Sequence, residues 1–231
     1  MMILPPPAPY VMLMASLPAL GPLLGSHEPP ITRTRLVERL RLLSPADRAE
    51  LEALEAGFAW TRLDMGLDDA TFLAGIDTLM ARLTRPAIRD ALRDRLEIRT
   101  LMAALRRRHA GEAAPEPHEA WGYGRFTDTI RTHWSRPDFG VGREFRWIGS
   151  AREKLEAGDY AGLEAVVLQA SWDAATRHTT GHDFDFEALG LYLARWSLMD
   201  RWSRYDVAAA TARFAAMLDE AMAGVDLELA A

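Results

Sequence analysis

The 231-residue chain contains no cysteine and only one lysine, Lys154. The absence of cysteine excludes disulfide bonds, thiolate metal sites and cysteine nucleophiles, and it fits a reducing compartment. The net charge of -6 argues against a general nucleic-acid binder, because a phosphate-binding surface normally makes a domain basic. Hydrophobic residues make up 49% and charged residues 26% of the chain, which is typical of a globular protein.

Charged side chains are also absent from the first 26 residues, which are apolar and rich in proline. A secretory signal is the alternative there, but such signals carry Lys or Arg before the apolar run, and proline interrupts a spanning helix. The sequence therefore favours a cytoplasmic protein with an extended lead-in. Within it, residues 10–18 are expected to form a strand-like segment or a single helical turn, because the run is short and closed by prolines.

No stretch alternates apolar and polar residues as a half-buried strand would, and apolar residues instead recur with helical spacing. End signals support this: Ser44 is placed as an N-cap before Pro45, Asp185 is placed as another N-cap, and Gly111 follows a basic last turn. The predicted helices cover about residues 32–43, 44–54, 69–84, 86–111, 126–134, 144–156, 160–176, 186–205 and 207–223. The predicted fold class is all-α, a multi-helix bundle in two packed helical lobes.

Residues 111–124 are rich in glycine and proline and form the best candidate linker. We place a boundary there, between an N-terminal extended segment and helical lobe, residues 1–110, and a C-terminal helical lobe, residues 125–231.

The helix predicted around residues 189–206 is apolar on two sides. On a helical projection Tyr192 and Trp196 share one face, while Trp202 and Tyr205 lie on the opposite one. Such a helix is usually buried, here between residues 147–155 and 214–218. The alternative is that Trp202 and Tyr205 belong to a partner surface, where large aromatic side chains are enriched.

The end of the longest predicted helix is basic, with Arg106, Arg107 and Arg108 in succession. These side chains complement the carbonyl end of the helix dipole. A solvated, salt-bridged face and a docking site for an acidic partner are both compatible with this pattern.

No catalytic, cofactor-binding or metal site is predicted. His178 and His182 have the i, i+4 spacing of helical metal ligands, but Thr-Thr-Gly lies between them and indicates a loop. An enzyme is kept as an alternative, with Trp121, Tyr123, His178 and His182 around a cleft between the lobes.

Three segments together resemble a bacterial family of unknown function that is encoded with the subunits of V/A-type ATPases. The first two are "YVMLMASLPAL", residues 10–20, and "LSPADRAELEAL", residues 43–54. The third, residues 184–218, is similar to the closing signature of that family, whose positions fall here on Phe184, Tyr192, Arg201, Trp202 and Phe214.

Members of that family look like stand-ins for the socket subunit of V/A-type ATPases, which is designated C, or d in eukaryotes. The socket subunit is the helical protein that joins the central rotor stalk to the membrane ring of proteolipid subunits. Residues 96–111, "LEIRTLMAALRRRHAG", also resemble a recurrent helix of the socket subunit, with Thr100 where that protein usually has asparagine.

The resemblance implies a non-catalytic structural or assembly subunit of a rotary V/A-type ATPase. Its partners would be the stalk subunits and the proteolipid ring, and it would lie at the cytoplasmic face of the membrane, attached through these proteins only. Arg201, Trp202, Tyr205 and Arg106 to Arg108 are the expected contact residues. At 231 residues the chain is shorter than the three-lobed socket subunit and would supply part of that socket. An all-helical interaction scaffold unrelated to the ATPase is the other alternative.

Overall fold

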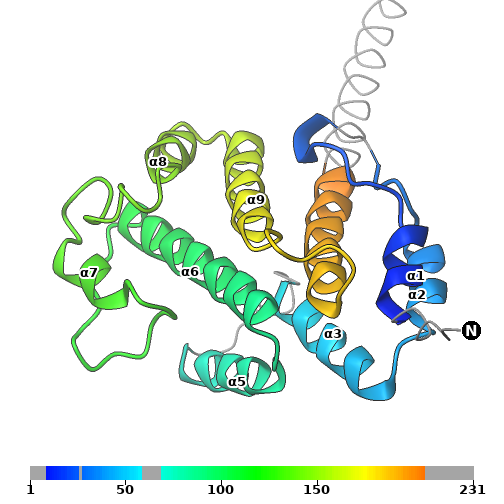
Figure 1. Cartoon of the computed structure of the whole chain (residues 1–231). Helices are drawn as coiled ribbons and strands as arrows, with labels where there is room; N and C mark the ends of the chain where they lie inside the picture. Colours follow the sequence, from blue (N-terminus) through cyan, green and yellow to red (C-terminus); the bar gives the residue numbers. More distant parts are fainter. Residues whose placement is uncertain (1–8, 26–27, 59–68, 206–231) are drawn as a thin grey trace, which may run out of the picture.

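The structure is a computed structural model that describes residues 9–25, 28–58 and 69–205. Within these ranges every regular element is helical, which confirms the predicted all-α class (Figure 1). The elements are α1 (Pro9–Ser16), the 3₁₀ turn η1 (Leu23–Gly25), α2 (Arg33–Leu40), α3 (Pro45–Phe58), α5 (Asp69–Arg82), α6 (Pro86–His109), α7 (Thr127–Thr132), α8 (Ile148–Glu156), α9 (Tyr160–Arg177) and helix 186–205. The helix predicted over residues 207–223 lies outside the described residues.

Local end signals confirm three of the predicted helix boundaries. The Ser44 hydroxyl accepts a hydrogen bond from the Asp47 backbone N–H at 3.1 Å, as an N-cap does. The Asp185 carboxylate accepts one from the Ala188 N–H at 2.7 Å, at the start of helix 186–205. After α6, Gly111 adopts a φ of +81°, which a glycine reaches without steric cost.

Residues 10–18 differ from the prediction, because most of them form helix α1. Eight residues are too few for a stable isolated helix, so contacts with the rest of the chain must stabilise it. Leu13 is buried in the core, and the Tyr10 ring packs edge-on against Phe186 at 5.8 Å. The Tyr10 hydroxyl donates to the Asp47 carboxylate of α3 at 2.8 Å.

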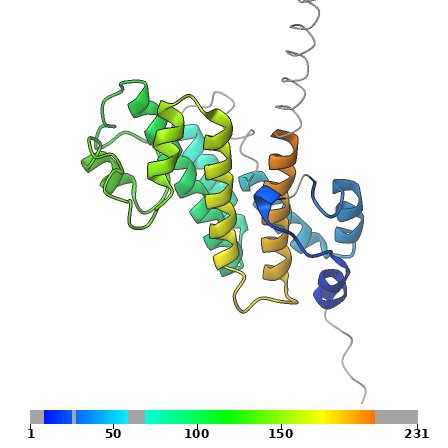
Figure 2. The ribbon, with the colours of Figure 1, turned by 90° about the horizontal axis from the view of Figure 1, so that it is seen from above.

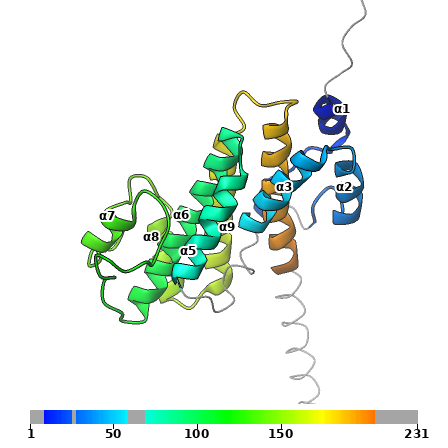
Figure 3. The same ribbon diagram turned by 90° about the horizontal axis from the view of Figure 1, so that it is seen from below.

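The described helices surround two hydrophobic cores. The first core joins α1, α2, α3 and α5 to the first half of α6 and to helix 186–205. The second core joins the other half of α6 to α7, α8 and most of the buried face of α9. The views in Figure 2 and Figure 3 agree with Figure 1 in placing α7 and α8 at one end of the molecule and α1 and α2 at the other, with helix 186–205 between α9 and the N-terminal helices.

The predicted linker packs back along α6. The Tyr123 backbone N–H donates to the Thr100 hydroxyl, which in turn donates to the Tyr123 carbonyl, both at 2.9 Å. Arg125 pairs with the Glu97 carboxylate at 2.8 Å, and Trp121 is buried. The division into residues 1–110 and 125–231 stays a prediction, and the two cores group the helices differently, since helix 186–205 packs with the N-terminal helices.

Helix 186–205 is buried on both sides along most of its length, which confirms its interpretation as a central helix. Its neighbours differ from those predicted. The Trp196 indole donates to the Ile31 carbonyl at 2.8 Å, and the Tyr192 hydroxyl donates to the Pro18 carbonyl at 2.9 Å. Residues 147–155 contribute instead to the second core, because α8 packs on α9 and α6, while residues 214–218 lie outside the described chain.

Among the described helices, none combines the length and the apolarity that crossing a bilayer requires.

Candidate functional site

Four of the six predicted contact residues come together on one surface. Arg106, at the end of α6, and Tyr205, at the end of the described part of helix 186–205, both line a depression of about 140 Å³. Arg201 and Trp202 lie directly beside it through their contacts with Glu164 and Tyr205. The lining residues of this depression are Met102, Arg106, Tyr160, Leu163, Glu164, Val167 and Tyr205.

The aromatic groups of this surface are ordered by helical spacing. Trp202 and Tyr205 are three residues apart, so they share a face, and their rings stack with centroids 6.1 Å apart. Tyr160, at the start of α9, is 65% exposed. Large, partly exposed aromatic side chains with a polar atom are typical of protein interfaces. We call this surface, made by Arg106, Tyr160, Glu164, Arg201, Trp202 and Tyr205, the aromatic patch.

Glu164 is the one acidic residue among the six that make the aromatic patch. Its carboxylate accepts a hydrogen bond from Arg201 Nε at 2.5 Å. Burial lowers the pKa of Arg95 to about 9 and the charge of Arg201 acts in the same direction, whereas the charge of Glu164 raises it. Glu164 therefore pairs with Arg201 at the surface and favours the charged form of Arg95 in the interior.

The side chains of Arg107 and Arg108 make ion pairs, hydrogen bonds and ring contacts within the chain. Arg107 pairs with Glu112 at 2.8 Å and with Glu119 at 3.0 Å. The Arg108 guanidinium stacks 4.0 Å from the Phe139 ring centroid. It also donates to the backbone carbonyls of Trp134, Arg136 and Pro137. Of the three arginines only Arg106 lies in the aromatic patch, and the other two hold the segment between α6 and α8.

A larger groove of about 820 Å³ lies between α6, α8 and α9. Phe126, Phe145 and Trp147 contribute aromatic side chains to it, and the exposed Arg143 and Arg146 also line it. The sequence did not reveal this groove, because its walls come from residues 94–98, 125–126, 143–150 and 165–177, with Leu24 beside them. The alternation of arginines and aromatics in residues 143–147 was the one signal that could have indicated it.

The four residues of the enzyme hypothesis line neither depression. Trp121 is buried against Trp134, with ring centroids 6.3 Å apart, and Tyr123 is held to α6 by its backbone. His178 Nε2 lies 2.9 Å from the Asp94 carboxylate, whereas His182 Nδ1 lies 2.7 Å from that of Asp185. The predicted loop is confirmed, because α9 ends at Arg177 and the two imidazoles have different partners.

Comparison of the chain with protein-family models, with curated proteins and with solved structures finds no match.

Proposed function

We propose that this protein is a non-catalytic structural or assembly subunit of a bacterial V/A-type rotary ATPase. In this role it resembles the socket subunit and links the central rotor stalk to the membrane proteolipid ring. It lies at the inner face of the cytoplasmic membrane and is attached there through its protein partners. The finer fold assignment, a bundle of two helical lobes like that of the socket subunit, belongs to the same proposal.

One observation carries the proposal: the three segments that resemble the ATPase-associated family contact one another. Tyr10, in the first segment, donates to Asp47, in the second, at 2.8 Å. Tyr192, in the third, donates to the carbonyl of Pro18, in the first, at 2.9 Å. Motif residues that are far apart in the chain thus form one structural unit, which is the behaviour expected of a family signature that specifies a fold.

The aromatic patch supports a role in protein contacts. It combines a stacked Trp202–Tyr205 pair, an exposed Tyr160 and the exposed Arg106, and hot spots of protein interfaces are enriched in these residue types. A protein that couples the rotor stalk to the ring needs such a surface and rigid helices that transmit torque.

Affinity purification of the tagged protein, expressed from its own locus, tests the proposal by mass spectrometry of the recovered proteins. We expect stalk, catalytic and proteolipid subunits in stoichiometric amounts. Recovery of the protein without any ATPase subunit would refute the proposal.

A double variant in the aromatic patch tests the contact site, and Trp202 is half-buried there, with part of its side chain packed against the first core. The double change Trp202→Ala and Tyr205→Ala is expected to reduce recovery of ATPase subunits by about tenfold or more, because truncating a hot-spot residue costs about 2 kcal/mol or more of binding free energy and about 1.4 kcal/mol corresponds to tenfold in affinity. Leu42→Ala is the matched control, since Leu42 is 70% exposed and lies outside the patch. Both variants are checked for wild-type circular dichroism first.

The 820 Å³ groove favours a second function, an all-helical interaction scaffold unrelated to the ATPase. In that case the affinity purification recovers a partner that is not an ATPase subunit. Trp147→Ala, which removes an aromatic side chain from the groove, should abolish recovery of that partner, whereas the Trp202→Ala and Tyr205→Ala double variant should not.

A further inference from the structure

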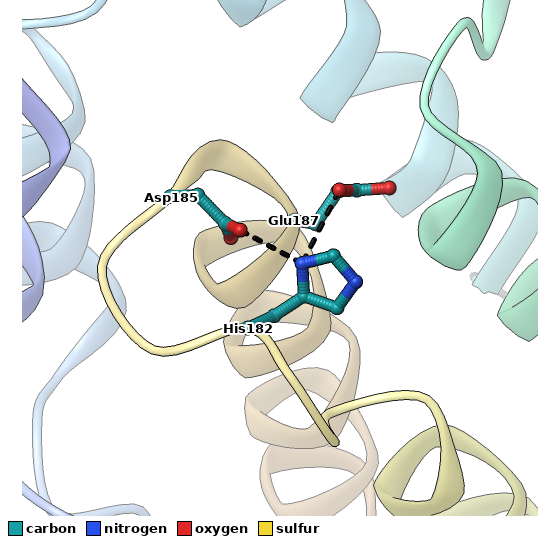
Figure 4. Close-up of side chains that lie close together, drawn as sticks. All are labelled: His182, Asp185 and Glu187. Atoms are coloured by element: carbon teal, nitrogen blue, oxygen red, sulfur yellow. Dashed lines mark hydrogen bonds and ion pairs between the residues drawn. The ribbon is translucent and has the colours of Figure 1, made fainter.

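We propose that His182, Asp185 and Glu187 form a binding site for a divalent transition-metal ion. The three side chains lie where the chain turns from α9 into helix 186–205, and they point toward one another (Figure 4). This site is separate from the aromatic patch, which lies at the other end of helix 186–205, and it does not depend on the proposed ATPase role.

The ligand atoms are already close to coordinating positions. His182 Nδ1 lies 2.7 Å from Asp185 Oδ2 and 3.2 Å from Glu187 Oε2. One atom from each of the three side chains lies within 4.8 Å of the others. Metal–ligand bonds of about 2.0–2.2 Å to imidazole and carboxylate place neighbouring ligands roughly 3 Å apart, so small side-chain movements accommodate an ion.

Both carboxylates are oriented by backbone groups outside the triad. The second oxygen of Asp185 accepts the Ala188 N–H at 2.7 Å. The second oxygen of Glu187 accepts the N–H of Ala87, at the start of α6, at 3.0 Å. Each carboxylate therefore keeps one oxygen, Oδ2 or Oε2, for the position that Nδ1 faces. Such outer hydrogen bonds are the usual means by which proteins orient metal ligands.

The donor set selects the kind of ion. One imidazole nitrogen and two carboxylate oxygens suit Zn²⁺, Mn²⁺ or Fe²⁺, whereas an all-oxygen site would suit Mg²⁺ or Ca²⁺. The His182 side chain is 24% exposed, which leaves space for water as a further ligand. A bound ion would tie the α9 loop to helix 186–205 and, through Glu187 and Ala87, to the start of α6.

Isothermal titration of the full-length protein with Zn²⁺ alone tests the site. The titration is run at about pH 8, because the hydrogen bond to Asp185 raises the pKa of His182 and a protonated imidazole cannot bind a metal. We expect one equivalent of Zn²⁺ to bind and to raise the melting temperature. We also expect Co²⁺ to give visible absorption bands of a protein-bound ion that disappear when Zn²⁺ is added.

Three variants test whether Zn²⁺ binds at His182, Asp185 and Glu187 or elsewhere on the protein. His182→Ala is expected to weaken Zn²⁺ binding by more than about tenfold. Glu187→Gln keeps an oxygen that can accept the Ala87 N–H but removes the charged ligand, so it should also weaken binding while the protein stays folded. His178→Ala removes an imidazole with a different partner and should bind Zn²⁺ like the wild type. Absence of Zn²⁺ binding, or equal binding by wild type and His182→Ala, would overturn the proposal and leave an imidazole–carboxylate ion pair.

Discussion

At the scale of single residues, the Arg85 guanidinium neutralises the negative charges of two α3 carboxylates that have little access to solvent. Its guanidinium contacts Asp47 at 2.9 Å and also pairs with Glu50, whose side chain is 5% exposed. Burial raises the pKa of both carboxyls, but their hydrogen bonds, from Ser44 and Tyr10 to Asp47 and from Thr84 and Arg85 to Glu50, outweigh it. Both pKa values therefore lie below their ordinary range.

Replacing Arg85 with methionine is expected to lower the free energy of unfolding at pH 7 by about 3 kcal/mol, because it leaves two poorly solvated carboxylates without their cation. Carboxyls with lowered pKa values stabilise the folded state above their unfolded pKa, and this stabilisation is lost as pH falls through the folded pKa. The difference between wild type and variant should therefore be full above about pH 5 and shrink toward about pH 3. Urea denaturation across this pH range measures it.

Arg93→Met is the control for Arg85→Met. Arg93 pairs with Asp90 at 2.6 Å, but that carboxylate is 42% exposed, so the change should cost less than about 1 kcal/mol. A pH-independent loss in Arg85→Met would show that packing rather than charge accounts for its effect.

At the scale of the elements, helix 186–205 depends on a glycine where other helices cross it. A Cβ at Gly190 would lie 2.5 Å from the Ile88 Cδ1 of α6 and 3.4 Å from a Leu54 methyl of α3. The helix is apolar on both sides, so it can be buried between neighbours, and at Gly190 a larger residue would require the Ile88 side chain to shift.

Gly190→Ala is expected to destabilise the protein by about 0.5–2 kcal/mol, because overpacking of the crossing by the added methyl costs more than the roughly 0.5–1 kcal/mol that alanine gains over glycine in a helix. Gly75→Ala is the matched control: Gly75 lies inside α5 and a methyl added there would have nothing within 4 Å, so alanine should stabilise the protein by about 0.5–1 kcal/mol. Thermal and urea denaturation of both variants measure whether each change raises or lowers the free energy of unfolding. A stabilised Gly190→Ala would mean that α6 and helix 186–205 do not cross this closely.

At the scale of the whole molecule, α6 belongs to both cores. Leu92 lies in the first core and Leu101 in the second, and both are fully buried on the same 24-residue helix. Because the helix is continuous, loss of either core removes the packing that holds half of it.

Leu92→Ala and Leu101→Ala are each expected to lower the free energy of unfolding of the protein by about 2–5 kcal/mol and to keep one cooperative transition. Tryptophan fluorescence and far-ultraviolet circular dichroism should give the same midpoint for each variant. Two separate transitions, with Leu101→Ala lowering the midpoint of only one, would instead show that the two cores unfold independently.

Several features of the fold followed from neighbouring residues alone. The start of α3 at Ser44 and Pro45, the end of α6 before Gly111 and the cap at Asp185 all depend on interactions within one helical turn, which sequence shows directly. The same holds for the all-α class and for the burial of helix 186–205, since hydrophobic periodicity reports both.

The tertiary structure decided everything that depends on partners distant in sequence. Tyr192 and Pro18 are 174 positions apart, and contacts of this kind make α1 helical and place helix 186–205 in the first core. The candidate site follows the same division. The sequence indicated Trp202, Tyr205 and Arg106, but only the packing of α6 and α9 showed that they share a surface and that Arg107 and Arg108 do not. Periodicity determines which face of a helix is buried, whereas the choice of neighbour depends on how side chains from several helices fit together.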